Sequence, residues 1–226
     1  MGLSLVVGPA HVGKVALLLE RYLDVLQHEP WLVVPNRVEV DRIERDLVQR
    51  RPALLAGTVG TFDDLFRHLA VVGPYADGIA TEIQRMFAAR RAIAGVELES
   101  LGASAATSGF ADTLLQTITE LESALAEPDS LDRELFELVV AYRSELAALG
   151  MQDRDGMRRL AVERLRSDLD AWSGAPVLAY GFEDLTGAEW ALLEALSART
   201  EVTVSIPYEP GRAAFETLER TVEDLA

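Results

Sequence analysis

Short apolar runs alternate with amphipathic segments at both ends of the 226-residue chain. Each run is rich in Val, Leu or Ile and lies next to Gly or Pro, which is typical of strands buried in a sheet. We predict strands in LSLVVG (3–8), WLVVP (31–35), the start of GTVGTFDDLFRHL (57–69), PVLAYGF (176–182) and EVTVSIPY (201–208). Apolar residues recur at helical spacing between and after these runs, over 14–27, 37–49, 187–196 and 211–225. This alternation predicts a parallel sheet with helices between its strands.

Long helical patterns replace the alternation between about residues 79 and 172. They cover 81–94, 109–125, 130–149 and 154–172, and the small-residue linker GASAATSG (102–109) separates the first two. A long stretch with almost no strand signal is typical of an all-helical insertion into an α/β core. We therefore predict an α/β fold whose core is divided, with a first part at 1–78, a helical insertion at 79–172 and a second part at 173–226.

Charge and composition narrow the classes of function. The formal net charge of −16 argues against a broadly basic surface that coats DNA. A local basic groove on an acidic protein is still compatible with this charge. The stronger alternative that the charge raises is burial of one face of the chain against a partner protein. The absence of cysteine excludes disulfides, thiolate zinc sites and iron–sulfur ligation by these residues. No apolar run reaches the roughly 18 residues of a membrane-spanning helix. The N-terminus lacks a signal-peptide pattern, so we expect a cytoplasmic protein that does not enter a membrane.

The loop GPAHVGK has the spacing of a phosphate-binding loop, with Gly8 followed after four residues by Gly13 and Lys14. It lies between a predicted strand and a predicted helix, where such a loop belongs. Lys14 is the only lysine in a chain with 20 arginines, and two glycines at these offsets coincide by chance about once in 200. The next residue, Val15, lacks the hydroxyl that binds Mg²⁺ in an active loop. We take Gly8, Gly13, Lys14 and Val15 as the candidate nucleotide-binding set; a purely structural glycine turn is the alternative.

In the order of its segments, the chain resembles domain 1 of superfamily 1 helicases of the UvrD/Rep type, in which a RecA-like core (1A) carries a helical insertion (1B). GPAHVGK is similar to their Walker A loop, WLVVPNRVEVDRIERDL to motif Ia, and TVGTFDDLFRHL to motif Ic. VLAYGFEDLTGAEWALLEAL has the frame of motif II, the Walker B segment, which normally reads like V-D-E-F-Q-D-L-T. The resemblance implies a P-loop RecA-like parallel sheet with a large all-helical insertion.

More narrowly, VVPNR, GFEDLTGAE and VTVSIPYEPGRAAFE resemble the N-terminal helicase-like part of AddB-type subunits of ATP-dependent helicase–nucleases. Members of that family continue through a second motor-like domain to a nuclease of the PD-(D/E)XK type with a cysteine-bound iron–sulfur cluster. The resemblance implies that this chain is an N-terminal domain without the cluster. Its implied partners are the motor subunit of a helicase–nuclease heterodimer and single-stranded or double-stranded DNA ends.

Alignment on the motif II frame indicates a loss of catalytic groups. Tyr180 stands where the magnesium-binding aspartate belongs, and Gly181 stands where the water-activating glutamate belongs. Glu183 and Asp184 would replace them only through a shift of register, and the segment resembling motif III reads Ser-Ile-Pro at 205–207 in place of Gly-Asp and a glutamine. Hydrolysis needs metal-assisted charge stabilisation and an oriented water. We therefore predict no catalytic residue in this chain, and at most weak binding of ATP.

The candidate DNA contacts are Asn36, Arg37 and Thr61, with Arg67 as a further candidate. By resemblance, the first two occupy the DNA-facing turn of motif Ia, and Thr61 is the hydroxyl residue of motif Ic that meets the DNA backbone. A structural alternative is equally open for Arg37 and Thr61, because Arg37 can pair with Asp41 and Thr61 can serve only as a helix N-cap. The three histidines show no ligand spacing, so we predict no metal site.

The leading hypothesis is a helicase-like, hydrolysis-deficient domain that acts as scaffold and DNA-scanning module in double-strand break repair and recombination. One alternative is an active ATP-dependent DNA helicase motor domain with an unorthodox magnesium site. Another is a P-loop-derived protein-interaction module without a DNA role, which the net charge of −16 favours.

Overall fold

The computed structural model describes residues 2–9, 13–51, 56–70, 78–124, 126, 131–182 and 185–208. The chain divides into two compact units. The sheet unit consists of Met1–Leu69 and Val162–Ala226, and the helical unit is Ala70–Ala161. The predicted helix at 211–225 lies outside the described residues.

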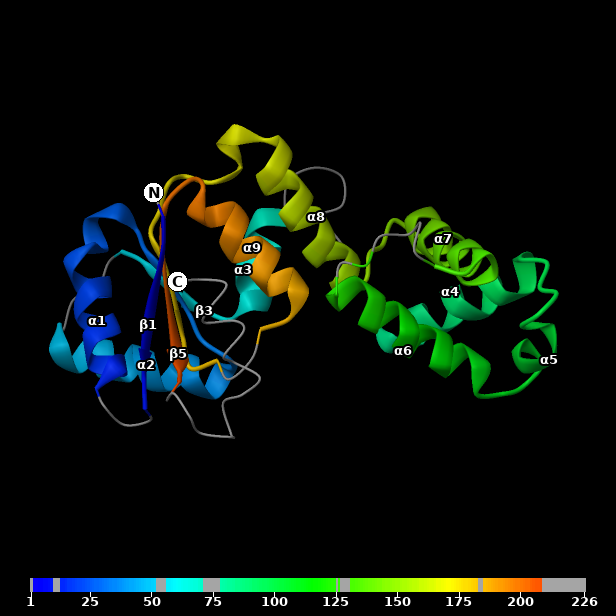
Figure 1. Cartoon of the computed structure of the whole chain (residues 1–226), viewed down its shortest axis with the longest axis horizontal. Helices are drawn as coiled ribbons and strands as arrows, with labels where there is room; N and C mark the ends of the chain where they lie inside the picture. Colours follow the sequence, from blue (N-terminus) through cyan, green and yellow to red (C-terminus); the bar gives the residue numbers. More distant parts are fainter. Residues whose placement is uncertain are drawn as a thin grey trace. The chain divides into compact units, whose positions relative to one another are not determined.

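A five-stranded, all-parallel sheet forms the centre of the sheet unit, which confirms the α/β fold (Figure 1). Its order is β1-β5-β4-β2-β3. The strands are β1 (Gly2–Gly8), β2 (Trp31–Val33), β3 (Thr58–Gly60), β4 (Val177–Tyr180) and β5 (Glu201–Pro207). Each lies within one of the apolar runs of the sequence, apart from one residue at the start of β1. Because all five are parallel, the ends of the strands that lead into the candidate loops lie at one edge of the sheet.

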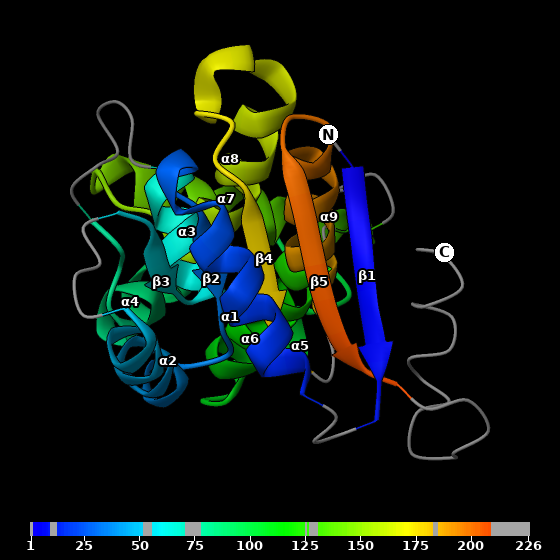
Figure 2. The same cartoon turned by 90° about the vertical axis from the view of Figure 1, so that its left-hand side faces the viewer.

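Helices cover both faces of the sheet (Figures 1 and 2). The chain moves along the sheet in one direction through α1 (Lys14–Asp24) and α2 (Arg37–Arg50), and in the opposite direction through α9 (Gly187–Ser197). Right-handed crossovers then place α1 and α2 on one face and α9 on the other. Figure 2 shows α1 and α2 in front of the strands and α9 behind them.

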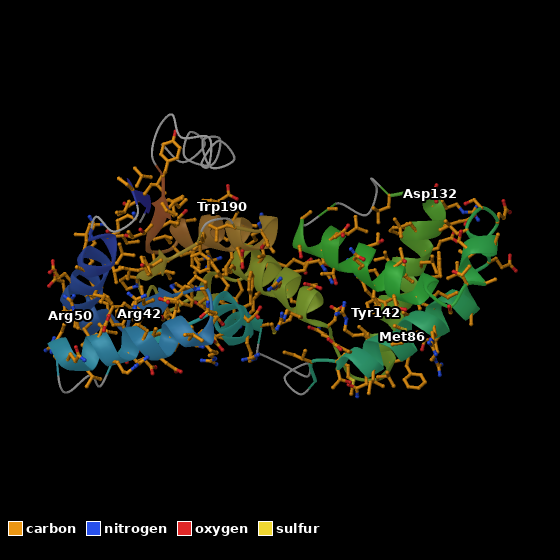
Figure 3. The ribbon with its side chains drawn as sticks, turned by 90° about the horizontal axis from the view of Figure 1, so that it is seen from below. Arg42, Arg50, Met86, Asp132, Tyr142 and Trp190 are labelled. Carbon is orange, nitrogen blue, oxygen red and sulfur yellow. The ribbon has the colours of Figure 1, made fainter. Side chains whose placement is uncertain are left out.

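The face beneath α1 and α2 is closed by one hydrophobic cluster. Leu18, Leu19 and Tyr22 of α1 pack with the apolar stripe of α2 over Leu32 and Leu178 of the neighbouring strands β2 and β4. The opposite side of α2 carries charged side chains such as Arg42 and Arg50 (Figure 3). The predicted helix at 14–27 is in fact interrupted, because α1 ends at Asp24 and a 3₁₀ turn, η1 (Leu26–His28), follows.

The remaining described elements of the sheet unit belong to the two segments that connect strands of the sheet to the helical unit along the chain. They are α3 (Phe62–Ala70), which directly follows β3, the C-terminal part of α8 (Arg154–Ser167), and η3 (Leu169–Ala171). The boundary between the two compact units falls within α8 and just before the last residue of α3. The predicted helix at 154–172 is therefore divided into α8 and the short turn η3.

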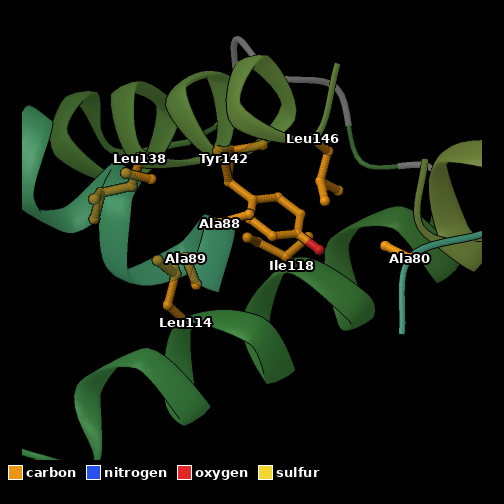
Figure 4. Packing of buried hydrophobic residues seen from close by; sticks show 10 residues of the cluster. Ala80, Ala88, Ala89, Leu114, Ile118, Leu138, Tyr142 and Leu146 are labelled. Atoms are coloured by element: carbon orange, nitrogen blue, oxygen red, sulfur yellow. The ribbon is translucent and has the colours of Figure 1, made fainter. Parts of the chain in front are cut away.

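The helical unit is built from α4 (Glu82–Gly95), α5 (Gly102–Ala105), α6 (Phe110–Ser123), α7 (Arg133–Ala148) and the start of α8. Small residues of α4, Ala88 and Ala89 among them, let this helix approach α6 and α7 closely. Tyr142 reaches from α7 into the middle of this core, beside Ile118 of α6 (Figure 4). The predicted linker at 102–109 contains the short helix α5.

A buried carboxylate holds the segment that leads into α5. Glu134, in the first turn of α7, accepts hydrogen bonds from the backbone N–H groups of Glu99, Ser100 and Leu101 at 2.8–2.9 Å. The N–H groups of Ser100 and Leu101 lower the pKa of Glu134 to about 2. Three successive amides thus hold one anion of the same chain.

We expect this contact to make the helical unit sensitive to acid. The folded-state pKa of Glu134 lies below its ordinary value of 4.5, so the stabilisation is complete above that value and is lost as pH falls toward 2. Glu134→Gln should lower the melting temperature at pH 7, and its difference from the unaltered chain should shrink below pH 4.5. Melting curves across this range test the expectation, and a constant difference would contradict it.

Candidate functional site

The chain turns from β1 into α1 through a left-handed glycine. Gly13 has φ +88° and precedes Lys14, the first residue of α1. Lys14 Nζ donates to the carbonyl oxygens of Gly8 and Pro9 at 2.6 and 2.5 Å. Burial lowers the pKa of Lys14. Residues 10–12 lie outside the described residues, so the predicted phosphate-binding loop stays a prediction. The ammonium group of Lys14 is bound to two carbonyl oxygens at the start of this loop.

A row of three residues crosses the adjacent strands β1, β5 and β4 near their carboxyl ends. Val6 is in register with Ser205, and Ser205 is in register with Tyr180. Val6 and Tyr180 pack against the cluster beneath α1, as does Val15 from the first turn of that helix. Burial raises the pKa of Tyr180. The row has no carboxylate, and its two outer members, like Val15, have a packing role.

The buried centre of this row is polar. Ser205 is 1% exposed, and its hydroxyl has no hydrogen-bond partner among the described residues.

Gly181 occupies a backbone conformation that excludes most side chains. Its φ is +87°, and a Cβ atom added to it would lie 3.3 Å from Cδ of Pro35. Left-handed backbone is disfavoured for every L-residue with a branched or long side chain. The position aligned with the water-activating glutamate therefore has a backbone built for glycine. Glu183 and Asp184, the predicted substitutes, lie outside the described residues.

The candidate DNA contacts lie after β2 and β3, which are neighbours with Val33 opposite Gly60. Asn36 is the N-cap of α2 and accepts from the backbone N–H of Glu39 at 3.0 Å. Thr61 directly precedes α3, and its hydroxyl accepts from the backbone N–H of Asp64 at 3.3 Å. Both polar side chains thus have the N-cap role that their sequence position allows.

Asp64, a residue that was not among the candidates, joins three of them. Its Oδ2 accepts from the backbone N–H and the hydroxyl of Thr61 at 2.9 and 2.8 Å. Its Oδ1 accepts from Arg37 at 3.0 Å and from Arg67 at 3.4 Å. The structure therefore pairs Arg37 with Asp64 and not with Asp41, the alternative partner considered from the sequence. The spacing Thr-x-x-Asp predicts the helix cap, but no local pattern predicts the pairing across 27 residues.

The electrostatics of this group are those of one shared anion between two cations. Burial alone would raise the pKa of Asp64, but the hydrogen bonds from Thr61 and the charges of Arg37 and Arg67 hold it below its usual value. The side chains of Arg37 and Arg67 are 69% and 51% exposed, whereas that of Asp64 is 19% exposed. We call Arg37, Thr61, Asp64 and Arg67 the Asp64 group; its outward face is cationic.

Two features are absent from the part of the chain that the structure describes: a cluster of metal ligands and a helix that could span a membrane. Those residues contain no group of three or more His, Asp or Glu side chains placed to hold a metal ion. None of their helices is both long and apolar enough to cross a membrane.

Comparison with known proteins finds a similarity to one component of a helicase–nuclease. The chain is 28% identical over 235 aligned positions to the B subunit of the ATP-dependent helicase/deoxyribonuclease of Pelotomaculum thermopropionicum. The alignment covers 91% of this chain and 20% of that protein, so the chain spans about a fifth of the length of its relative. No protein-family model matches the chain. The similarity supports the AddB-type resemblance of the sequence.

Proposed function

We propose that the chain is a helicase-like, hydrolysis-deficient P-loop domain of an AddB-type subunit, with a RecA-like core (1–78 and 173–226) and a 1B-like insertion (79–172) of the UvrD/Rep kind. It serves as a scaffold and DNA-scanning module in double-strand break repair and recombination. Its partners are the motor subunit of a helicase–nuclease heterodimer and DNA ends. The similarity to a helicase/deoxyribonuclease component is the main support for this family of functions.

The loss of hydrolysis is supported by the row Val6, Ser205 and Tyr180 and by the left-handed Gly181. An active site needs a carboxylate for Mg²⁺ and a base for water near the phosphate loop. Here the corresponding positions carry a packed aromatic ring and a glycine. Lys14 retains the charge needed to bind a phosphate weakly, but it must first leave the carbonyls of Gly8 and Pro9.

DNA contact is supported by the Asp64 group. Ligands of parallel α/β sheets bind beyond the carboxyl ends of the strands, where Arg37 and Arg67 expose their guanidinium groups. Arginines in such a position bind phosphate oxygens without reading bases. Asp64 moderates this contact, because each arginine must exchange its carboxylate for a phosphate.

Charge substitutions in the Asp64 group are expected to change DNA affinity in opposite directions. Arg37→Gln and Arg67→Gln should each weaken binding of a single-stranded oligonucleotide and lower the salt dependence by about 0.7 in log–log slope. Asp64→Asn should strengthen binding by up to about fivefold, since a surface ion pair is worth up to ~1 kcal/mol. Fluorescence anisotropy at several salt concentrations measures both effects.

The matched control is Asp41→Asn, which removes the same charge four residues from Arg37 but not from its ion pair. If Asp41→Asn strengthens binding as much as Asp64→Asn does, net charge and not the Asp64 group controls affinity. DNA affinity that ignores Arg37 and Arg67 altogether would contradict the scanning role. Absence of any DNA affinity would favour the protein-interaction module, for which the net charge of −16 speaks.

A further inference from the structure

Helix α4 of the helical unit has its small apolar side chains inside and its bulky ones outside. Ala88, Ala89 and Ala92 are buried in the core that α4 forms with α6 and α7 (Figure 4). Ile83 and Phe87, by contrast, are 70% and 63% exposed. A helix at the surface of a protein normally turns its bulky apolar side chains toward the core. Packing within the helical unit therefore does not account for the outward position of Ile83 and Phe87.

Four neighbouring side chains form one stripe along the outside of α4. Residues three and four positions apart lie next to each other on a helix surface. Ile83 therefore adjoins Met86 and Phe87, and both of these adjoin Arg90. Met86 is half-buried, and the other three side chains are exposed. We call Ile83, Met86, Phe87 and Arg90 the α4 stripe; nothing in the proposed function uses it.

The charge of the stripe is positive, although the helical unit as a whole is acidic. Residues 70–161 have eight arginines and fifteen acids, which gives a formal net charge of −7. The part of α4 at 85–95, by contrast, has three arginines and no acid. Arg85 and Arg91 are bound to side chains of the same unit, whereas Arg90 has no partner among the described residues. The stripe thus presents apolar side chains around one exposed, unpaired cation.

Charge and residue type distinguish three occupants of the stripe. A second copy of the chain is unfavourable, because two molecules with a net charge of −16 repel each other. A strand of nucleic acid is held by cations along its backbone, and the stripe offers only Arg90. Phe, Met and Arg are instead residue types enriched in protein interfaces. We infer that the α4 stripe binds an amphipathic helix of a partner protein, with a carboxylate of that helix on Arg90.

The stripe lies on a helix whose conformation is fixed before binding. A capping box holds the first turn of α4, in which the backbone N–H of Thr81 donates to Oε1 of Gln84 at 2.9 Å. Close packing of the buried alanines holds the opposite side of the helix. Ile83 and Phe87 belong to a row of residues four apart, and such rows fit into the grooves of a second helix. Binding therefore orders few groups of this chain beyond the side chains of the stripe, which keeps its cost low.

The test selects phage-displayed random peptides of about 20 residues, long enough to form a helix, against the full chain. Enriched peptides should have apolar residues at positions i, i+3 or i+4, and i+7, with Asp or Glu next to them. Phe87→Ser should raise the dissociation constant of a labelled synthetic copy at least about tenfold, because buried aromatic side chains carry much of the energy of an interface. The matched control is Phe136→Ser, which removes an exposed ring from α7 and should leave the constant unchanged. Fluorescence anisotropy measures both.

A charge exchange tests the ion pair with Arg90. Arg90→Glu should weaken binding of the acidic peptide and strengthen binding of a version in which Lys replaces the acid, so that the preference reverses. Arg133→Glu makes the same charge change at the start of α7 and should leave the preference as it is. A preference that Arg90→Glu does not change, or that Arg133→Glu changes equally, would overturn the assignment of the carboxylate to Arg90.

The inference fails if no peptide of this pattern is enriched, or if the enriched peptides bind the Phe87→Ser chain as tightly as the unaltered chain. A dimer in sedimentation that Phe87→Ser dissociates would assign the stripe to a second copy instead. Oligonucleotide binding that Phe87→Ser weakens in a chain with Arg37→Gln and Arg67→Gln would assign it to DNA. A lower melting temperature of Phe87→Ser would mean that the ring packs within its own chain; we expect no change, since exposed side chains contribute little to stability. Peptide binding needs neither nucleotide nor DNA, so its outcome is independent of the proposed function.

Discussion

Restoring the two missing carboxylates with Tyr180→Asp and Gly181→Glu is expected to unfold the site and not to reactivate it. We expect the free energy of unfolding to fall by about 2–5 kcal/mol, from the left-handed backbone and from the lost packing of a half-buried ring. Tyr180 packs against the cluster beneath α1, and Gly181 has φ +87° beside Pro35. Turnover of Mg-ATP should stay at the level of the Lys14→Ala chain. Urea denaturation and phosphate release measure the two quantities.

Two single substitutions separate the causes. Gly181→Ala tests the left-handed backbone and the close contact with Pro35 without adding a carboxylate, and it should cost about 1–2 kcal/mol. Tyr180→Phe keeps the ring and should change stability little, because it removes only a hydroxyl from a half-buried residue. If the double variant hydrolyses ATP above the Lys14→Ala level, the site needs only these two groups. That result would contradict the expectation that the site cannot be reactivated, whereas Mg-ATP turnover by the unaltered chain above the Lys14→Ala level would favour a motor domain over the hydrolysis-deficient domain.

Secondary structure could be predicted from the sequence where it depends on neighbouring residues. The strands lie in apolar runs bounded by Gly or Pro, because such runs have few other ways to bury themselves. The order β1-β5-β4-β2-β3 was not readable, since pairing across the sheet is decided by tertiary packing. The segment before α5 lies between the predicted helix at 81–94 and the predicted linker at 102–109, and its conformation depends on Glu134, more than 30 residues away.

In the candidate site too, what the sequence indicated depends on neighbouring residues and not on tertiary packing. The N-cap role of Thr61 was the structural alternative considered from the sequence, whereas that of Asn36, which has the same place before a helix, was not named there. Arg67 pairs with Asp64 at i,i+3 spacing within α3, whereas the approach of Arg37 follows from the pairing of β2 with β3, which brings the two following segments together. Sequence reasoning named both arginines and missed the carboxylate. Asp64 is an acid in the first turn of α3, where an acid is favourable for the helix alone, so the local pattern indicates no second role.

Removing the buried Asp153 carboxylate is expected to destabilise the helical unit strongly. Asp153→Ala should lower its free energy of unfolding by about 3–5 kcal/mol, the usual cost of breaking a buried charged pair. Asp153 is 5% exposed, caps the start of α8 through Gly156 N–H at 2.7 Å, and accepts from Tyr142 Oη at 2.9 Å. Arg85 lies 4.0 Å from the same oxygen and donates to Tyr142 at 3.2 Å. The loss would leave Arg85 and the hydroxyl of Tyr142 without their carboxylate.

The pKa of Tyr142 reflects the same network. Burial and the neighbouring Asp153 carboxylate raise it above the usual value for a tyrosine, while Arg85 opposes the shift. The hydroxyl therefore stays protonated and serves as the donor to Asp153 throughout the physiological range. Tyr142→Phe should cost about 1–3 kcal/mol, less than Asp153→Ala, because it removes one hydrogen-bonding group and leaves the charges paired.

Asp132→Ala is the matched control for Asp153→Ala. Asp132 also caps a helix, accepting from the N–H of Glu134 at 3.0 Å, but it is exposed (Figure 3). Its removal should cost only about 1 kcal/mol, the usual value of an N-cap. Denaturation of both variants by urea gives the comparison. Equal losses would mean that Asp153 acts only as a cap. A larger loss for Asp153→Ala would mean that the network of Arg85, Tyr142 and Asp153 holds the start of α8 against α4 and α7.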